Sequence, residues 1–456
     1  MSLLSRFFGG SKPGAGSGRR ALVIGLDGVP HSLLSRLIAD GDMPNLATIA
    51  GSGELRQATS TYPAVSCAAW TSFVTGVNPG AHGVFGFTDI RPGTYELHIT
   101  GSNYVTSPPL WRMLNERGHR AIVMNVPVTF PPPQVDGLLV SGFLAPELKG
   151  ATHPPELAGR LAALGYRIDI DPWKARQSLD ALLEDLDLTL KGRVAGAVEL
   201  LTRERWSFGM VHIMGTDRAN HFMWGKWASG DEQYAPRFLD YYRKVDAAVG
   251  EIAAAAGEET ELLLLSDHGF TETEHELNLD VWLRERGYLG VPASAEAKLT
   301  DIDESTRAFS MTPGRIYLNV RGRQPRGSVE PGSEYEALRK EIIAGLREIA
   351  HPDTGEPVME HVFRREEIFH GESVQRAPDL LAHPVNGIDL KSSLGGAELF
   401  GHSPITGMHT YDDAFWLVRG RGFGDGTPQV HDGAATVLAL LGEEPPDHLD
   451  GRSAIG

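Results

Sequence analysis

Residues 61–83 have the sequence TYPAVSCAAWTSFVTGVNPGAHG. The spacing predicts one short helix from Ser66 to Thr75, closed by Gly76, because a glycine just past a helix end supplies the left-handed residue of a C-cap. Ser66 then lies in the first turn, where unpaired backbone N–H groups and the helix dipole can receive an anion. An ordinary N-cap serine has the same appearance. The role of Ser66 therefore depends on residues elsewhere in the chain.

Continuous apolar runs alternate with amphipathic segments along the rest of the chain. Such runs are typical of parallel strands buried on both faces, and Ser178–Thr202 between two of them has clear helical periodicity. The pattern indicates an α/β fold in three layers, with a large, mostly parallel mixed sheet between helices. The expected strands are Ala21–Leu26, Arg120–Val126, Val140–Phe143, Trp206–Met214 and Glu261–Leu265.

The pattern also divides the chain into three parts. Residues 1–20 contain a Gly/Ser/Pro linker and are predicted to form a flexible tail. Residues 21–456 are predicted to form one catalytic domain. Within it, residues 270–405 have a looser, Gly/Pro-rich and polar pattern, which indicates an insertion that shapes the substrate pocket.

Composition excludes several classes of function. The formal net charge of −17 argues against binding of a nucleic acid polymer, which needs a basic surface. One cysteine, Cys67, excludes an internal disulfide and a cysteine-based zinc cluster. No run approaches the roughly 20 apolar residues that span a bilayer. Without a recognisable export signal, we expect a cytoplasmic protein; its oligomeric state stays open.

Three of the expected strands end in carboxylate or imidazole side chains, where open α/β sheets place their ligands. Asp217 and His221 are four residues apart, so on a helical turn they face the same way. Oxygen and nitrogen donors of this kind suit Zn²⁺, or Mn²⁺ in less selective sites. The sequence thus predicts two adjoining metal sites. The first contains Asp27, Ser66, Asp267 and His268, and the second contains Asp217, His221 and His409.

The order of these motifs resembles the alkaline phosphatase superfamily, and within it the type I phosphodiesterase/nucleotide pyrophosphatase branch. The resemblance covers residues 21–456. It implies two zinc ions, a small phosphorylated substrate and a covalent phosphoseryl intermediate on Ser66. The matching pieces are Gly25-Leu26-Asp27-Gly28, Ser66 ten residues before Gly76, Asn78-Pro79-Gly80-Ala81-His82-Gly83, Asp217-Arg218-Ala219-Asn220-His221, Ser266-Asp267-His268-Gly269, Gly407-Met408-His409 and Asp450-Gly451-Arg452-Ser453.

The residues after Ser66 depart from the family pattern. Nucleotide pyrophosphatases usually have a threonine nucleophile followed by Phe-Pro-Asn, whose asparagine helps to hold the phosphate. Here Cys67-Ala68-Ala69 follows, without that asparagine and without the arginine that grips a monoester in alkaline phosphatases. Trp70 occupies the position of the sulfatase arginine, which counts against a sulfatase. Cys67 is predicted to be a small buried residue.

The sequence predicts hydrolysis of phosphoric esters, most simply of diesters. Phosphomonoesterase, phosphonate hydrolase and phosphotransferase activities of the same superfamily stay open, as does a relative that binds a phosphorylated ligand without turnover. Arg218 and Asn220 are candidates for a contact with the substrate phosphate. His212, inside an expected strand, is predicted to be structural. His402 is a further candidate ligand or general acid, or a loop histidine without a role.

Overall fold

β1 (Ala21–Leu26) lies inside an eight-stranded sheet in the computed structural model, which describes residues 18–292, 294 and 296–456. All six residues of β1 are buried because both faces of the sheet are covered. Its neighbours β8 and β9 run parallel to it, whereas the edge strands are antiparallel. The strands, in sheet order, are β2 (Glu54–Ala58), β19 (Ala414–Val418), β9 (Glu261–Leu265), β1, β8 (Phe208–Ile213), β5 (Ala121–Met124), β6 (Gly137–Val140) and β7 (Thr152–His153).

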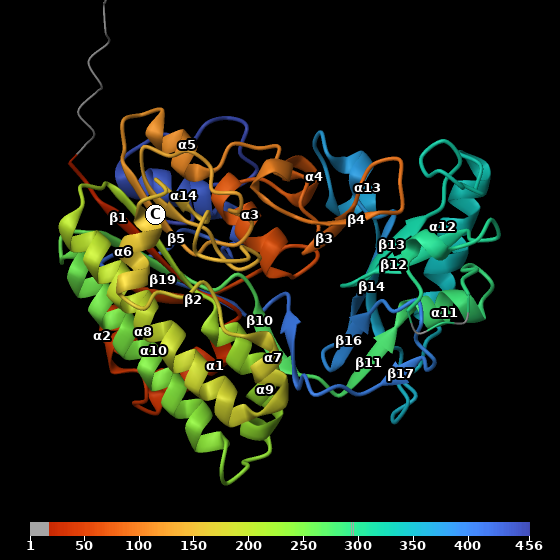
Figure 1. Ribbon diagram of the computed structural model, residues 1–456, viewed down its shortest axis with the longest axis horizontal. Coiled ribbons are helices and arrows are strands. Elements are labelled where there is room, and N and C mark those ends of the chain that lie inside the picture. Colours follow the sequence, from red (N-terminus) through yellow and green to blue (C-terminus); the bar gives the residue numbers. More distant parts are fainter. Residues whose placement is uncertain (1–17, 293, 295) are drawn as a thin grey trace, which may run out of the picture.

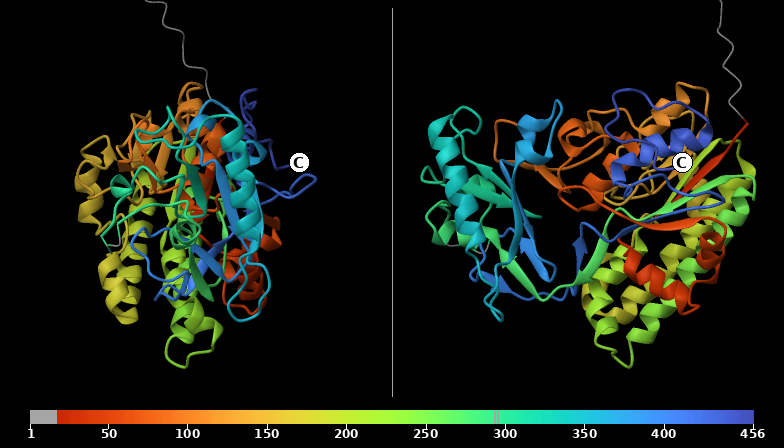
Figure 2. Two further views of the ribbon diagram at one scale, coloured as in Figure 1. Left: turned by 90° about the vertical axis from the view of Figure 1, so that its right-hand side faces the viewer. Right: turned by 180° about the vertical axis from the view of Figure 1, so that it is seen from behind.

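Helices cover both faces of this sheet, so the predicted three-layer α/β architecture is confirmed (Figures 1 and 2). Leu22 and Ile24 of β1 contribute to one apolar core, and Ala21 and Val23 to the other, as strand alternation requires. The first core contains α1 (His31–Ala39), α2 (Pro44–Gly51), α6 (Leu157–Ala163), α8 (Leu179–Arg203), α9 (Gly215–Ala228) and α10 (Ala235–Ala256). The second contains α3 (Ser66–Thr75), α5 (Leu110–Asn115) and α14 (Gly433–Leu441).

Three strands differ in their bounds from the prediction: β5 and β8 are shorter at both ends than expected, and β6 is displaced. The expected strand over Val140–Phe143 is wrong, because β6 covers Gly137–Val140 instead. Parallel pairing with β5 sets this register, beginning with Ala121 opposite Gly137. Residues 141–143 then leave the sheet.

A second lobe is formed by residues between about 275 and 405 (Figure 1). It has its own apolar core and two small sheets. The sheets contain β12 (Ala308–Met311), β13 (Arg315–Leu318), β15 (Leu380–Pro384) and β14 (Met359–Arg364), and β16 (Ile388–Lys391), β11 (His275–Asn278) and β17 (Phe400–Gly401). The helices are α11 (Leu279–Glu285), α12 (Ser333–Arg347) and α13 (Arg365–Ile368).

Strand pairs and a hairpin join the two lobes. The chain leaves the first lobe through β10 (Gly269–Glu272) and returns through its antiparallel partner β18 (Gly407–Thr410). A hairpin of β3 (Thr88–Ile90) and β4 (Leu97–Ile99) reaches the second lobe from the other side, where the Tyr95 hydroxyl donates to Asn319 Oδ1 at 2.7 Å. Contacts on both sides of the gap therefore hold the lobes apart at a fixed spacing.

The remaining elements are short, and they connect the larger ones. The predicted tail of residues 1–20 lies, as far as residue 17, outside the described residues. Among the described helices, none is long and apolar enough to cross a membrane. The short helices are α4 (Pro79–His82), α7 (Pro172–Gln177), and the 3₁₀ turns η1 (Ser102–Tyr104), η2 (Leu299–Asp301), η3 (Val374–Arg376) and η4 (Val430–Asp432).

Two motifs that carry the family resemblance, the one around Asn78 and the one around Asp450, hold the end of α3 in place. Asp450 Oδ2 accepts hydrogen bonds from the backbone N–H (2.8 Å) and the side-chain amide (2.9 Å) of Asn78, which caps α4. His82 is fully buried and hydrogen-bonded to Ser72 of α3 at 2.8 Å. These contacts fix the far end of α3 and thereby the direction of the helix that begins at Ser66.

α3 begins at Ser66 and ends at Thr75, which confirms the predicted boundaries. Gly76 has φ +70°, and a Cβ there would lie 2.9 Å from Leu449. We expect Gly76→Ala to lower the free energy of unfolding by at least about 1–2 kcal/mol, the cost of a left-handed alanine. Chemical denaturation measures this. Gly51→Ala, in open space at the end of α2 with an ordinary φ, is the control and should leave stability almost unchanged. Equal midpoints for the two variants would contradict the prediction.

Candidate metal centre and active site

The predicted site residues converge at one edge of the sheet. Asp27 directly follows β1, and Asp267 and His268 lie between β9 and β10. Asp217 lies in the first turn of α9, immediately after β8. Because β9, β1 and β8 are adjacent parallel strands, their carboxyl ends bring these groups together. Ser66, at the start of α3, completes the group from the other side.

The first predicted group is closely packed. Asp27, Asp267 and His268 each offer a ligand atom, and these atoms lie within 4.8 Å of one another. The Ser66 hydroxyl donates to Asp27 Oδ1 at 3.2 Å and lies 3.4 Å from His268 Nε2. The Gly28 N–H donates to Asp267 Oδ1 at 3.1 Å, whereas Asp267 Oδ2 is buried without a hydrogen-bond partner in the described structure. That carboxylate oxygen is therefore available to a cation.

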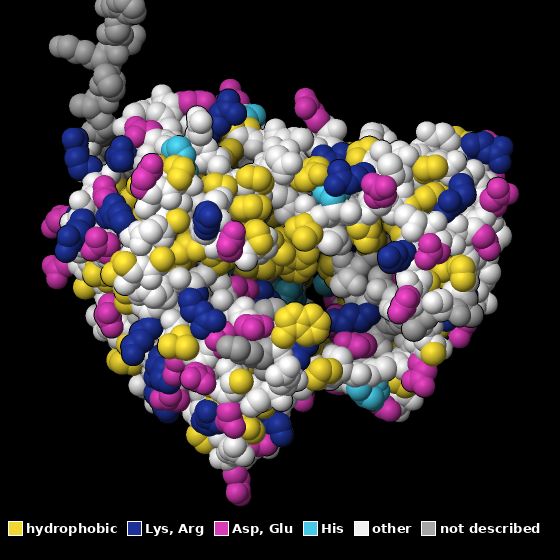
Figure 3. Space-filling view, viewed as in Figure 1, with side chains coloured by type: hydrophobic (Ala, Val, Ile, Leu, Met, Phe, Trp, Pro, Cys, Tyr) yellow, Lys and Arg dark blue, Asp and Glu magenta, His cyan; other side chains and the backbone are white. Residues whose placement is uncertain are grey.

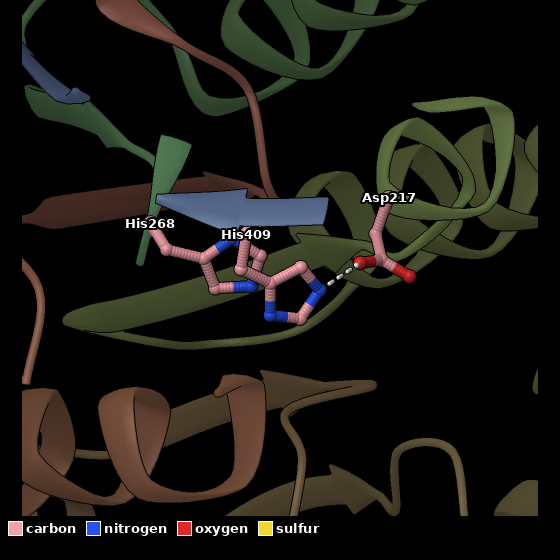
Figure 4. Close-up of side chains that lie close together, drawn as sticks. All are labelled: Asp217, His268 and His409. Atoms are coloured by element: carbon pink, nitrogen blue, oxygen red, sulfur yellow. Dashed lines mark hydrogen bonds and ion pairs between the residues drawn. The ribbon is translucent and has the colours of Figure 1, made fainter. Parts of the chain in front are cut away.

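The second predicted group also converges. His409 Nε2 lies 3.2 Å from Asp217 Oδ1 and 3.1 Å from His221 Nε2, and His221 Nε2 lies 3.4 Å from Asp217 Oδ1. The Asp217–His221 pair belongs to one face of α9, as its four-residue spacing predicts. The His268 and His409 rings stack with centroids 3.7 Å apart, so the two groups adjoin (Figure 4).

The three histidines are oriented in the same way. Each places Nδ1 within hydrogen-bond distance of a backbone carbonyl, which favours the tautomer with the proton on Nδ1 and leaves the Nε2 lone pair for a metal ion. The acceptors are the carbonyl oxygens of Gly407 for His221 (2.9 Å), Gly269 for His268 (3.0 Å) and Ala64 for His409 (3.0 Å).

Electrostatics also favours a cation here. The Asp27, Asp217 and Asp267 side chains are at most 3% exposed. Burial, reinforced by the Asp27 carboxylate, raises the pKa of Asp267 well above its ordinary value. Burial, with a contribution from His409, lowers the pKa of His268 to about 3, so this ring stays neutral. A divalent cation would compensate the buried carboxylates and use the neutral ring as a ligand.

Two residues that support Asp27 were not predicted as functional. The Trp70 indole donates to Asp27 Oδ2 at 2.8 Å, and His212 Nε2 lies 2.8 Å from the same oxygen. His212 was predicted to be structural, and its register opposite Gly25 places it one pair before the end of β1. Trp70 lies four residues after Ser66, on the same side of α3. This four-residue spacing from Ser66 was the sequence signal that could have identified Trp70 as a residue of the site.

The two predicted substrate contacts have protein partners instead. The Arg218 guanidinium donates to Asp169 Oδ2 at 2.7 Å and lies 3.4 Å from Asp217 Oδ2. The Asn220 side chain is fully buried, donates to the Gly28 carbonyl at 2.8 Å and accepts from Tyr242 at 2.9 Å. Both side chains therefore brace the ligand-bearing segments, and their contact with a substrate stays a prediction.

A cavity of about 1020 Å³ extends from the metal-ligand residues toward the second lobe. Figure 3 shows the hollow between the lobes, with hydrophobic side chains along its rim. His221 and His409 line its inner end, next to Val65, the residue before Ser66. The second-lobe and hairpin side includes Tyr95, Lys298, Met311, His383 and Lys391.

A family model for type I phosphodiesterase/nucleotide pyrophosphatase matches residues 21–412. The chain belongs to this family. It is therefore a member of the alkaline phosphatase superfamily and of a family of phosphoric ester hydrolases. No match was found among curated proteins.

Solved structures share the fold at low sequence identity. Phosphonoacetate hydrolase from Sinorhizobium meliloti 1021 has a TM-score of 0.64 at 17% identity, covering 93% of this chain and 95% of that one. Murine ectonucleotide pyrophosphatase/phosphodiesterase 5 has a TM-score of 0.58 at 16% identity, covering 96% and 100%. The human form has 0.58 at 15% identity, covering 95% and 97%.

The Trp70 hydrogen bond supplies a test of how Asp27 is positioned. We expect Trp70→Phe to lower zinc affinity about 10–100-fold, the usual effect of losing a group that orients a ligand. Competition with a chromophoric chelator measures this. Trp416→Phe is the matched control, because the Trp416 indole is equally buried and its N–H has no hydrogen-bond partner in the described structure. Equal zinc affinities of the two variants would show that the Asp27 contact is irrelevant to metal binding.

Proposed function

We propose that the protein hydrolyses small phosphodiesters at a two-metal site, with Ser66 as the nucleophile. One observation carries the proposal. The Ser66 hydroxyl lies at the first residue of α3, beside the first ligand group and close to the second, and the residue before it, Val65, lines the cavity. A nucleophile, a charge-stabilising site and space for a leaving group thus meet at one point.

The donor set fits Zn²⁺, and Mn²⁺ is the alternative. Each group offers three protein ligands other than serine, the number typical of catalytic zinc sites that keep a position open. When bound, the two ions would supply positive charge that favours the ionised serine hydroxyl and the developing phosphoryl charge. We assign Asp27, Asp267, His268 and the Ser66 oxygen to one ion, and Asp217, His221 and His409 to the other.

The chain itself positions the reacting groups. Val65, the N-cap of α3, has no side-chain oxygen, so the first N–H groups of the helix are free of a side-chain cap and face an incoming phosphoryl oxygen. The Ser66 hydroxyl gives up its proton to solvent, its Oγ–P bond forms as the bond to the leaving alkoxide breaks, and that alkoxide takes up a proton from solvent. Water then attacks the phosphoseryl ester, the Oγ–P bond breaks, and Ser66 regains its proton.

A diester fits this site better than a monoester. Ala68 and Ala69 occupy the first turn where a monoesterase arginine would be expected, and Arg218 is engaged by Asp169 and Asp217. A diester carries one negative charge and has less need of that cation. Two proteins of similar fold have small ligands in their solved structures. The murine protein is found with AMP, and the Sinorhizobium hydrolase with phosphonoacetate.

We further propose that the second lobe selects the leaving group. Lys298, His383 and Lys391 line the far side of the cavity, together with apolar Met311. A leaving group with an apolar or aromatic body and a second anionic group would find partners for both. Phosphonate hydrolysis is the second candidate function, because Lys298 could receive the carboxylate of a phosphonate substrate, whereas Lys391 already pairs with Asp389 at 2.5 Å.

Replacement of the nucleophile tests the covalent mechanism. We expect Ser66→Ala to lower kcat by at least about three orders of magnitude, since the hydroxyl that would form the intermediate is removed. Ser66→Thr, which restores the hydroxyl usual in the family, should recover measurable turnover. Bound metal is counted in both variants. Wild-type turnover by metal-loaded Ser66→Ala would refute the phosphoseryl mechanism.

A paired rate assay tests the substrate class. Zinc-loaded protein should cleave a chromogenic phosphodiester faster than the matching monoester, because the cation that grips a dianion is missing. Phosphonoacetate is assayed in parallel for the second candidate. A higher kcat/KM for the monoester would reject the diester assignment. Tight binding of all substrates without product over hours would instead indicate a binding protein.

A further inference from the structure

A second cluster of metal-ligand side chains lies in the second lobe. His275 begins β11, and His351 and Asp353 lie in the loop after α12. These three residues offer ligand atoms within 4.8 Å of one another. His275 Nε2 lies 2.6 Å from Asp353 Oδ2, and the His275 and His351 ring centroids are 5.1 Å apart. None of the three lines the cavity that reaches the active site.

His402 adds a third imidazole through strand pairing. β11 and β17 are antiparallel, with Glu276 opposite Gly401, so the next position of the ladder places His402 opposite His275. Their ring centroids are 4.9 Å apart. His402 Nδ1 lies 3.1 Å from the Glu274 carbonyl, a contact that favours the Nδ1 proton and leaves the Nε2 lone pair available. This is the same orientation that the active-site histidines have.

The cluster is arranged around its carboxylate. The Asp353 carboxylate lies 2.6 Å from His275 Nε2, and the Asp353 backbone N–H lies 3.2 Å from His351 Nδ1. The His275 and His351 side chains are only 11% and 10% exposed, whereas Asp353 is 70% exposed. The His275 and His351 rings are mostly buried, whereas the Asp353 carboxylate is accessible to solvent. An ion could therefore enter beside this carboxylate and reach both rings, together with the His402 ring from the neighbouring strand.

We propose that His275, His351 and Asp353, with His402 as fourth ligand, bind a third divalent metal ion of the Zn²⁺ type. Three imidazoles and one carboxylate are a common zinc donor set, and four protein ligands are typical of a structural site. The ion would bind the loop after α12 to β11 and β17. These strands continue the two segments through which the chain enters and leaves the second lobe (Figure 1). The ion would therefore stabilise the junction between the second lobe and the two segments that connect it to the first lobe.

Metal counting on the full-length protein tests this proposal. The protein is loaded with Zn²⁺, freed of weakly bound ions on a desalting column and analysed by mass spectrometry of elements. We expect His351→Ala and Asp353→Ala each to retain one zinc ion fewer per chain than wild type. Asp353 lies in an exposed loop, so that variant should fold normally. His361→Ala, at a 53% exposed histidine of the same lobe, is the control and should retain the wild-type number.

Activity separates this site from the catalytic one. Both variants should keep wild-type phosphodiester turnover while they lose the one ion. An unchanged zinc count in both variants would overturn the proposal and leave a hydrogen-bonded imidazole–carboxylate cluster. Parallel loss of turnover and of more than one ion would also overturn it, because the metal would then belong to the active site. A failure of the diesterase proposal would appear as absent wild-type turnover, with the zinc difference intact.

Discussion

Three buried carboxylates at the ends of adjacent parallel strands constrain this structure more than any other interaction. Asp27, Asp217 and Asp267 are brought together by the order β9-β1-β8, and their side chains are almost without solvent. Desolvated like charges at such distances are costly unless a cation or proton compensates them. The histidines beside them, with Nδ1 held by backbone carbonyls, complete a donor set for metal ions. The backbone geometry of the sheet thus creates the need for a compensating cation or proton before any substrate is considered.

The main sheet and its helices could be predicted because their signals are local. Glu261–Leu265 and Ser66–Thr75 have the predicted bounds, since a continuous apolar run and a closing glycine each mark their own ends. The strand at Val140–Phe143 was misplaced because its register depends on pairing with β5. The second lobe showed no clear pattern, because most of its strands have only four or five residues. Its sheets therefore required the tertiary structure.

The ligand residues were predictable for a related reason: a polar group at the end of an apolar run is conspicuous in sequence. Their supporting contacts were not. The approach of Trp70 and His212 to the same oxygen of Asp27 depends on strand register and on the angle at which α3 crosses the sheet. Arg218 was a candidate for a contact with the substrate phosphate, and only the structure shows that its partners are the carboxylates of Asp169 and Asp217. The sequence thus identified the candidate metal ligands, whereas the tertiary structure was needed to show which residues orient them.

The first lobe carries the proposed catalytic residues, and the second lobe carries the residues proposed to select the substrate. The proposed ligands of the two active-site ions and the nucleophile belong to the first lobe, whereas much of the opposite wall of the cavity comes from the second lobe and the β3–β4 hairpin. The hairpin contact between Tyr95 and Asn319 and the β10–β18 pair fix the spacing of these walls from two sides. Residues such as Lys298 and Lys391 can therefore change in charge or size without moving a metal ligand. This separation means that the substrate pocket can vary while the metal-ligand residues keep their positions.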